Sequence, residues 1–477
     1  MTQIKKTLAC MLALCMLLGA FAGCSTTKVI TTSSDVWTTI EEEDTTDNGE
    51  NNVSEDASST QSENVSSSTD KVTSSGNASG YTDNISGDFD PYKGIEKYRG
   101  KTVKVLFWFT PDDNEQKIID NFTKETGVKV KLYYAENAKY GSKLSSMVAS
   151  GSSPDVAGCF DSYFPSLVNK NLFDDISKGK FDLKNDPAYD IDTMNKYSWK
   201  GKYFGVTLKN AWSTAHPLVF FNRTLFKNAG VTEPTTLWKQ GNWNWDTMKD
   251  LAQKMTKKIN GIDIYGLGNI ATSYYLASYG TDLVKIDNAK GNITNNLNDP
   301  KVIKTYEYLA DLYASGCVAP KDTPWTIFTN GQCAMFSTGQ NWIENGGFFD
   351  DLKDEWSAVP FPSPKGEKEI HPVNAAFFGL GKGCKNPEMG SWFIRWHQDP
   401  ANWDIKGRCN TPELYELYKT MYSFENYNAI LGSNMFGAVA KNISEAAYGN
   451  KNDVGTTIAK YSGSLDSAIN NTINNLG

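Results

Sequence analysis

The chain beyond residue 101 alternates between runs typical of strands and runs typical of helices. Residues 103–109 (VKVLFWF) are a continuous β-branched and aromatic run, which predicts a buried strand. After it, Ile118, Ile119 and Phe122 recur at helical spacing, and Gly127 is a helix stop. The order strand, helix, strand, helix, strand predicts a parallel sheet, with ligand sites beyond the carboxyl ends of the strands. The predicted strands are 103–109, 128–134 and 154–160, and the predicted helices are 111–127 and 143–150.

Three longer helices are predicted further along, each with one apolar face. The helix over 245–255 has Asp246 as its candidate N-cap, and a second helix, over 301–316, ends at Gly316. The third helix, over 387–397, begins with a proline in its first turn, as helices often do. Its aromatic residues share one face and are interpreted as core: Trp392, Phe393 and Trp396.

Composition and charge describe a soluble globular part with an acidic leader. The 477 residues are 39% hydrophobic and 21% charged, which is enough for a sizeable core and two ordinary domains. The net charge of -8 is uneven, because residues 25–90 carry two Lys and fourteen Asp/Glu, whereas residues 91–477 are close to neutral. A nucleic-acid binder would show a strong basic field, so no nucleic-acid partner is expected.

The first 90 residues have the layout of an export signal and a tether. Lys5 and Lys6 precede an apolar run over 7–21, and this run leads into FAGC at residues 21–24, which resembles the lipobox of bacterial lipoproteins. We therefore expect a signal peptide over 1–23 and a diacylglycerol anchor on Cys24; a plain secretory signal with an incidental Cys is the alternative. Residues 24–90 are rich in Ser, Thr, Asp and Glu and predict a disordered tether, or else a glycosylated stalk. The folded part is then expected at the extracellular face of the cell membrane, held by the lipid only.

No motif for catalysis or metal binding stands out in the folded part. Its five Cys form no C-x-x-C pair, so we predict neither a zinc site nor a full set of disulfides. None of the three His lies in H-E-x-x-H, and G-x-S-x-G does not occur. A glycoside hydrolase remains an alternative, because such an enzyme needs a pair of carboxylates and Asp112 and Asp161 could form one. We therefore expect that the protein is not an enzyme and that it holds no metal ion and no cofactor.

Seven segments, taken in order, resemble the extracellular solute-binding proteins (family 1) of carbohydrate ABC importers, the family that includes maltose-binding protein. The resemblance implies an α/β fold of two lobes (type II periplasmic-binding-protein-like), joined by crossing hinge segments, with a ligand cleft between the lobes. It places lobe 1 at 91–212 and 361–407 and lobe 2 at 213–360 and 408–477. The crossings are expected near 211–217, 359–364 and 406–411. The matching segments are 103–132, 151–176, 201–231, 242–255, 328–342, 356–366 and 375–396.

A sugar offers C–H faces and hydroxyls, so its binding site needs flat aromatic rings and short polar groups. Several candidates follow predicted strands or match positions of the family, but Cys159 and Phe160 depart from its pattern, and Trp342 is displaced by one position. Asp112 is equally a candidate helix N-cap, and Tyr274 a candidate core residue. The candidate ligand-binding residues are Asp112, Asp161, Tyr163, Trp212, Tyr274, Asn341, Trp342 and Phe436.

The resemblance implies a monomeric, lipid-anchored receptor that captures a sugar or oligosaccharide and delivers it to the permease subunits of an ABC importer. Three alternatives remain. The same fold could carry a peptide, a polyamine or a ferric ion. The chain could instead be a polysaccharide-degrading enzyme, or a sensor subunit that presents a sugar-loaded lobe to a membrane kinase.

Overall fold

The computed structural model describes residues 89–477 except 212, 321–322, 324, 345–348, 350–351, 410, 425, 450–452 and 475–477. The predicted signal peptide, the lipidation site Cys24, the tether up to residue 88 and Trp212 lie outside the described residues. Among the helices that are described, none is both long and apolar enough to cross a membrane.

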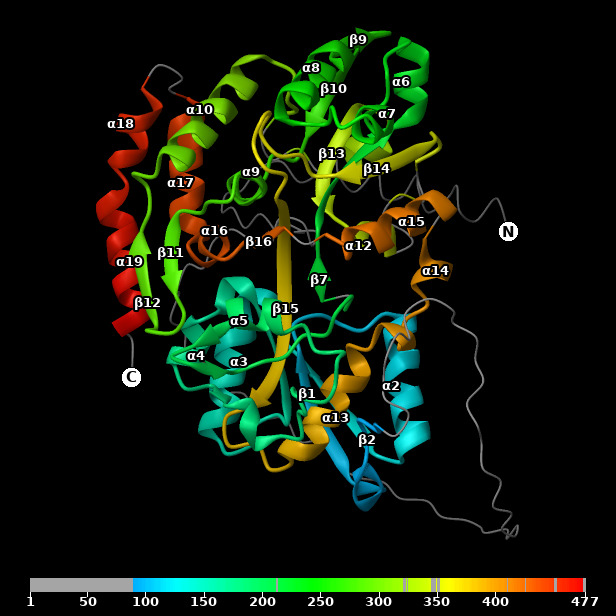
Figure 1. Ribbon diagram of the computed structural model, residues 1–477, viewed down its shortest axis with the longest axis vertical. Helices are drawn as coiled ribbons and strands as arrows, with labels where there is room; N and C mark the ends of the chain where they lie inside the picture. Colours follow the sequence, from blue (N-terminus) through cyan, green and yellow to red (C-terminus); the bar gives the residue numbers. More distant parts are fainter. Residues whose placement is uncertain are drawn as a thin grey trace, which may run out of the picture. The chain divides into compact units, whose positions relative to one another are not determined.

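Two large mixed sheets form the framework (Figure 1). In the seven-stranded sheet the order is β16-β15-β3-β1-β2, and β4 and β7 also pair with β15. Strand β1 runs parallel to β2 and β3, which confirms the predicted parallel β-α-β-α-β unit. The strands of this sheet are β1 (Thr102–Phe107), β2 (Lys129–Tyr134), β3 (Val156–Phe160), β4 (Phe173–Asp174), β7 (Thr214–Ala215), β15 (His371–Gly381) and β16 (Tyr427–Ala429).

The five-stranded sheet has the order β14-β8-β13-β10-β9. Its β8 is buried along its whole length, because this strand lies between two neighbours and its sequence PLVFFN is almost wholly apolar. The strands are β8 (Pro217–Asn222), β9 (Lys257–Ile259), β10 (Ile262–Gly268), β13 (Cys333–Gly339) and β14 (Trp356–Pro360), and two separate hairpins consist of β5 (Ser198–Trp199) with β6 (Lys202–Tyr203) and β11 (Val284–Asp287) with β12 (Asn292–Asn295).

Helices surround both sheets, and the predicted long ones are confirmed within a few residues. The described α-helices are α2 (Asp113–Thr126), α3 (Asn137–Ala149), α4 (Ser166–Asn169), α5 (Ile191–Lys196), α6 (Arg223–Ala229), α7 (Pro234–Lys239), α8 (Trp245–Met255), α9 (Thr272–Ser278), α10 (Pro300–Ala314), α11 (Thr326–Thr329), α12 (Asn341–Glu344), α13 (Pro387–His397), α14 (Ile405–Arg408), α15 (Pro412–Met421), α16 (Gly432–Met435), α17 (Gly437–Tyr448), α18 (Val454–Ala459) and α19 (Ser462–Asn474). The 3₁₀ turns among the described residues are η1 (Ile95–Tyr98), η2 (Asp161–Tyr163), η3 (Ile176–Lys178) and η4 (Pro400–Asn402).

The N-cap predicted for α8 is wrong by two residues. Asn244, not Asp246, caps this helix, and its side-chain oxygen accepts from the backbone N–H groups of Asp246 and Thr247. Thr247 returns the bond by accepting from the Asn244 N–H, which completes a capping box. Asp246 instead lies in the first turn, where its negative charge faces the positive end of the helix dipole.

Helix α13 is a core element of the seven-stranded sheet, as its aromatic face predicts. Trp392 and Phe393 are almost fully buried, and the half-buried Trp396 donates its indole N–H to the Ile118 carbonyl of α2. The close contact with the backbone just before β3 requires a glycine in α13, because a Cβ on Gly390 would lie 2.7 Å from the Asp155 carbonyl oxygen. The packing of α13 therefore fixes both α2 and β3.

Strand β15 connects the regions on which the candidate site depends, and it stands near the centre of Figure 1. Its first residues pair with β16, the next with β7, the following ones with β3 and the last with β4. The strands β7 and β16 fall in segments predicted for lobe 2, yet both pair with β15 in the sheet that contains β1–β3. Three of the five cysteines in the described part are buried: Cys159, Cys317 and Cys333.

Candidate ligand-binding site

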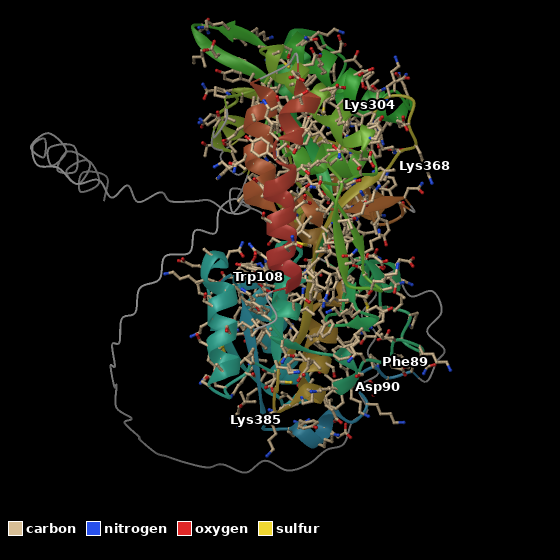
Figure 2. The ribbon with its side chains drawn as sticks, turned by 90° about the vertical axis from the view of Figure 1, so that its left-hand side faces the viewer. Phe89, Asp90, Trp108, Lys304, Lys368 and Lys385 are labelled. Atoms are coloured by element: carbon tan, nitrogen blue, oxygen red, sulfur yellow. The ribbon has the colours of Figure 1, made fainter. Side chains whose placement is uncertain are left out.

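The carboxyl end of β1 presents two aromatic rings. Trp108 and Phe109 follow the strand directly and are half-buried; Figure 2 labels Trp108. The Trp108 ring lies 5.4 Å from Phe378 of β15 and meets Tyr140 of α3 edge-on. Gly158 in the neighbouring strand makes room for it, because a Cβ there would lie 1.8 Å from the ring. The apolar run over 103–109 places Trp108 in the strand itself, whereas its position at the carboxyl end of β1 is one where ligand contacts are expected.

Asp112 caps helix α2. Its carboxylate accepts hydrogen bonds from the backbone N–H groups of Asn114 at 2.9 Å and Glu115 at 2.8 Å, and its side chain is exposed. This is the role that its place before a helix predicted. A contact between Asp112 and ligand stays a prediction.

The 3₁₀ turn η2 and helix α16 lie against each other, so the structure brings together the segments of three predicted site residues. Asp161 and Tyr163 belong to η2, and Phe436 follows α16 and is buried. The Tyr163 hydroxyl donates to the Asn137 carbonyl, and burial raises the pKa of Tyr163 to about 12, so it stays a neutral donor. The Asp161 side chain is outside the described part.

Asp282 fixes the position of α16, a role that sequence reasoning missed. Its carboxylate accepts from the Gly432 N–H at 2.7 Å and from the Ser433 hydroxyl at 2.6 Å. One residue later in α16, the Asn434 amide donates to Asn374 of β15 at 3.2 Å. The helix is thus tied to the segment before β11 and to the central strand, across about 150 and 60 residues of sequence, which no local pattern reveals.

Trp342 lies in the hydrophobic core in this structure. Only 5% of its surface is exposed, and its ring packs within 6 Å of Trp325, Phe336 and Phe349. Asn341 precedes it in α12, but its side chain is outside the described part. A packing role accounts for the position of Trp342, and a contact of either residue with ligand stays a prediction.

Tyr274 lies on α9 and is half-buried. Its ring meets Phe361 edge-on at 5.6 Å and packs beside the core of the five-stranded sheet. The next residue, Tyr275, is fully buried in that core. Tyr275 is therefore a core residue, whereas Tyr274 keeps a partly open ring, and a contact of Tyr274 with ligand stays a prediction.

Two buried histidines stand where the chain passes between the sheets. His216 lies between β7 and β8, and His371 begins β15. Burial lowers the pKa of His216 to about 3 and that of His371 to about 4. The Glu369 carboxylate lies 3.7 Å from His371 Nε2 but is largely exposed, so water screens its attraction. Both imidazoles are therefore neutral at pH 7.

Polar contacts also tie this crossing to α15. The Gln340 amide donates to the Tyr422 hydroxyl at 2.7 Å. That hydroxyl lies 3.2 Å from the Ala211 carbonyl oxygen and 3.1 Å from that of Thr214. Within the part of the chain that the structure describes, no group of three or more His, Cys, Asp or Glu side chains could hold a metal ion.

Known proteins share both the sequence pattern and the fold. A profile of the bacterial extracellular solute-binding proteins matches residues 117–403, more than half of the chain. The diacetylchitobiose binding protein DasA of Streptomyces coelicolor is 26% identical over 329 residues, which cover 65% of this chain and 72% of that protein.

Solved structures match over most of the chain. The Listeria monocytogenes substrate-binding protein Lmo0181, in complex with cycloalternan, has a TM-score of 0.57 and 18% identity, and the match covers 78% of this chain and 98% of that one. UgpB of Mycobacterium tuberculosis, in complex with glycerophosphocholine, has a TM-score of 0.62 and 13% identity, with 78% and 99% covered. The predicted α/β, periplasmic-binding-protein-like fold is thereby confirmed. With the profile match, these findings show that the chain belongs to the bacterial extracellular solute-binding proteins, a family of binding proteins rather than enzymes.

Proposed function

We propose that this protein captures a sugar or short oligosaccharide outside the cell and delivers it to the permease of an ABC importer. The observation that carries the sugar class is the match to DasA, whose name states that it binds diacetylchitobiose. The aromatic and amide side chains around β15 suit such a ligand, because rings can stack on sugar faces and amides can bond hydroxyls. Trp108, Asn374 and Asn434 are partly open residues of this kind.

The proposed mechanism is closure of two lobes around the ligand. Lobe 1 comprises residues 91–212 and 361–407, and lobe 2 comprises 213–360 and 408–477, so that each lobe holds most of one large sheet. Ligand contacts one lobe first, and hinge rotation then adds the contacts of the other lobe. Bending at the crossing beside His216 and at the start of β15 would move the two sheets relative to each other. The cleft residues proposed are the eight predicted ones together with Trp108.

A thermal shift experiment with a sugar panel tests the ligand class. The panel includes diacetylchitobiose and other di- and trisaccharides, and glycerophosphocholine is the non-sugar comparison. A ligand at 100 times its dissociation constant should raise the free energy of unfolding by about 2.7 kcal/mol. We expect at least one sugar to do so, without any change in the sugar recovered afterwards.

Two outcomes would contradict the proposal. If glycerophosphocholine stabilises the protein and no sugar of the panel does, the ligand of this protein is not a sugar. The fold match to UgpB, solved in complex with glycerophosphocholine, provides a precedent. Cleavage of a sugar during the incubation would show an enzyme.

The lipid anchor on Cys24 is a separate part of the proposal, and it rests on the FAGC sequence at residues 21–24. Cells that express the full chain should incorporate a fatty-acid label into it, and Cys24→Ala should abolish this label and release the protein into the medium. Cys384→Ala is the matched control, since this thiol lies in the folded part. Equal labelling of Cys24→Ala and its parent would remove the anchor from the proposal.

A further inference from the structure

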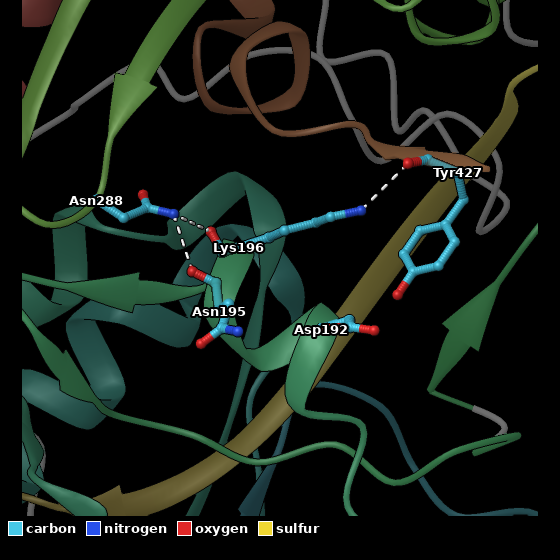
Figure 3. A pocket seen from close by; sticks show the side chains of 5 residues that line it. All are labelled: Asp192, Asn195, Lys196, Asn288 and Tyr427. Carbon is cyan, nitrogen blue, oxygen red and sulfur yellow. Dashed lines mark hydrogen bonds between the residues drawn. The ribbon is translucent and has the colours of Figure 1, made fainter. Parts of the chain in front are cut away.

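The turn after β11 contacts the end of helix α5, although the two are about 90 residues apart in sequence. The Asn288 side-chain amide donates to the Asn195 carbonyl at 3.1 Å and to the Lys196 carbonyl at 2.8 Å (Figure 3). These carbonyls belong to the last turn of α5, where the helix supplies no further i+4 N–H groups, and the Asn195 carbonyl also accepts from the Tyr197 N–H and the Ser198 hydroxyl. Asn288 belongs to proposed lobe 2 and α5 to proposed lobe 1, so Asn288 caps the C-terminal end of a helix in the opposite lobe.

The backbone strengthens this contact. The Lys200 N–H donates to the Asn288 carbonyl at 2.7 Å. The Lys200 side chain covers Gly291, where an added Cβ would lie 2.6 Å from Lys200 Cγ, and Gly291 also has a φ of 65°. The close approach of the two turns thus requires a glycine at position 291.

A second contact mirrors the first. Asn169, at the end of α4, donates its amide to the Thr472 carbonyl in the last turn of α19, at 3.0 Å. The Asn169 side-chain oxygen accepts from the buried Trp199 indole at 2.7 Å, which fixes the amide orientation. Asn169 belongs to proposed lobe 1 and α19 to proposed lobe 2. Each lobe therefore supplies one asparagine that caps a helix C-terminus of the other lobe.

The contact at Asn288 is polar and beside an open hollow. A pocket of about 440 Å³ is lined by Asp192, Asn195, Lys196, Asn288 and Tyr427. Its lysine is already engaged, since Lys196 Nζ donates to the Tyr427 carbonyl at 3.2 Å and lies 3.7 Å from the centre of that ring. Within the described part, the buried Asn288 Oδ1 has no hydrogen-bond partner. Hydration would satisfy this oxygen if the turn moved away, so the contact is poised to open.

We propose that two contacts, that of Asn288 with the C-terminal end of α5 and that of Asn169 with the C-terminal end of α19, together form a clasp that holds the two lobes in the described arrangement. The clasp thereby sets the position of the hinge equilibrium in the absence of ligand. The inference rests on the proposed function, since that function includes the hinge. A contact that forms in only one arrangement of the lobes shifts the hinge equilibrium towards that arrangement, by the free energy that the contact contributes there. The clasp therefore determines how much of the protein is ready to bind before ligand arrives.

Double electron–electron resonance on the ligand-free protein tests the clasp. Spin labels are placed at Lys124→Cys on α2 and Gln253→Cys on α8, both exposed, after the half-exposed Cys384 and Cys409 are changed to Ser. In Asn288→Ala we expect a second distance population, with a ratio to the first that is roughly 3- to 10-fold above the parent, as the loss of one or two hydrogen bonds implies. Asn169→Ala should act in the same direction.

Asn295→Ala is the matched control. This residue is in the same hairpin, but its side-chain NH₂ group donates to Ser462 and Asp466 of α19 and its side-chain oxygen accepts from the Leu297 N–H, all within one proposed lobe. We expect its distance distribution to equal that of the parent. An unchanged distribution in Asn288→Ala, or an equal change in Asn295→Ala, would overturn the clasp. Because no ligand is present, either result is independent of the sugar panel.

Discussion

Replacing Trp342 with alanine should lower the free energy of unfolding by about 3–5 kcal/mol, the usual cost of removing a large buried aromatic side chain. The indole is 5% exposed and contacts the rings of Phe336 and Phe349, which belong to the same core as Leu414 and Leu417 of α15. The neighbouring rings belong to β13 and the segment before β14, so they cannot collapse fully into the cavity. Urea unfolding followed by circular dichroism measures the change.

Trp342→Phe is the matched variant, because it keeps an aromatic ring and should cost clearly less than Trp342→Ala. Ligand affinity measured on the Phe variant then separates the two roles of this residue. If the alanine variant unfolds like the parent and loses ligand affinity, Trp342 contacts ligand, and the packing account is wrong. Affinity that is unchanged in Trp342→Phe would support the packing account.

Trp342 also shows why this part of the site could not be predicted from the sequence. Helix α12 has four residues, too few for a hydrophobic period to tell which face of it is buried. Asp112 presents a similar ambiguity, since a carboxylate after a strand and before a helix suits a ligand contact and a helix cap equally well. The structure assigns the cap role through two backbone N–H groups.

The sequence was most informative for elements in which apolar residues recur regularly within the element itself. Helices α8, α10 and α13 and the parallel strands β1, β2 and β3 lie where the apolar pattern predicts them. The strands β7 and β16 have two and three residues, and only their pairing with β15 defines them. The contacts of Asp282 with α16 and of Asn288 with α5 join distant segments, and single-sequence patterns carry no information on such pairs.

The second large effect is expected from pH, because two neutral histidines are buried at the chain crossing. The His216 imidazole is 4% exposed and bonds the Pro372 carbonyl, and its Nδ1 has no partner among the described residues. His371 is 3% exposed and stacks on Phe424 with ring centres 3.5 Å apart. A charge on either ring would lie in a mainly apolar environment, and the two rings would also repel each other once both were protonated.

The sign of the effect follows from the lowered pKa values of about 3 and about 4. In the unfolded chain both histidines take up protons near their ordinary pKa of about 6.5, whereas in the folded protein they stay neutral down to about pH 4. The unfolded state therefore binds more protons in this window. The contribution of the two histidines to the free energy of unfolding is fully present above pH 6.5 and is lost as the pH drops towards 4. Each histidine contributes a slope of up to about 1.4 kcal/mol per pH unit.

Urea unfolding at pH 7.5, 6.0 and 5.0 measures this slope, and His371→Gln is the informative variant. It removes one of the two titrating rings but leaves all carboxylates in place, so the other pH-dependent contributions cancel when the variant is compared with its parent. We expect its stability to fall less steeply below pH 6.5, by about 1 kcal/mol per pH unit. His216→Gln provides the same comparison at the other ring. Parallel slopes in the parent and both variants would mean that these histidines are protonated in the folded protein without cost, and that the crossing is open to water.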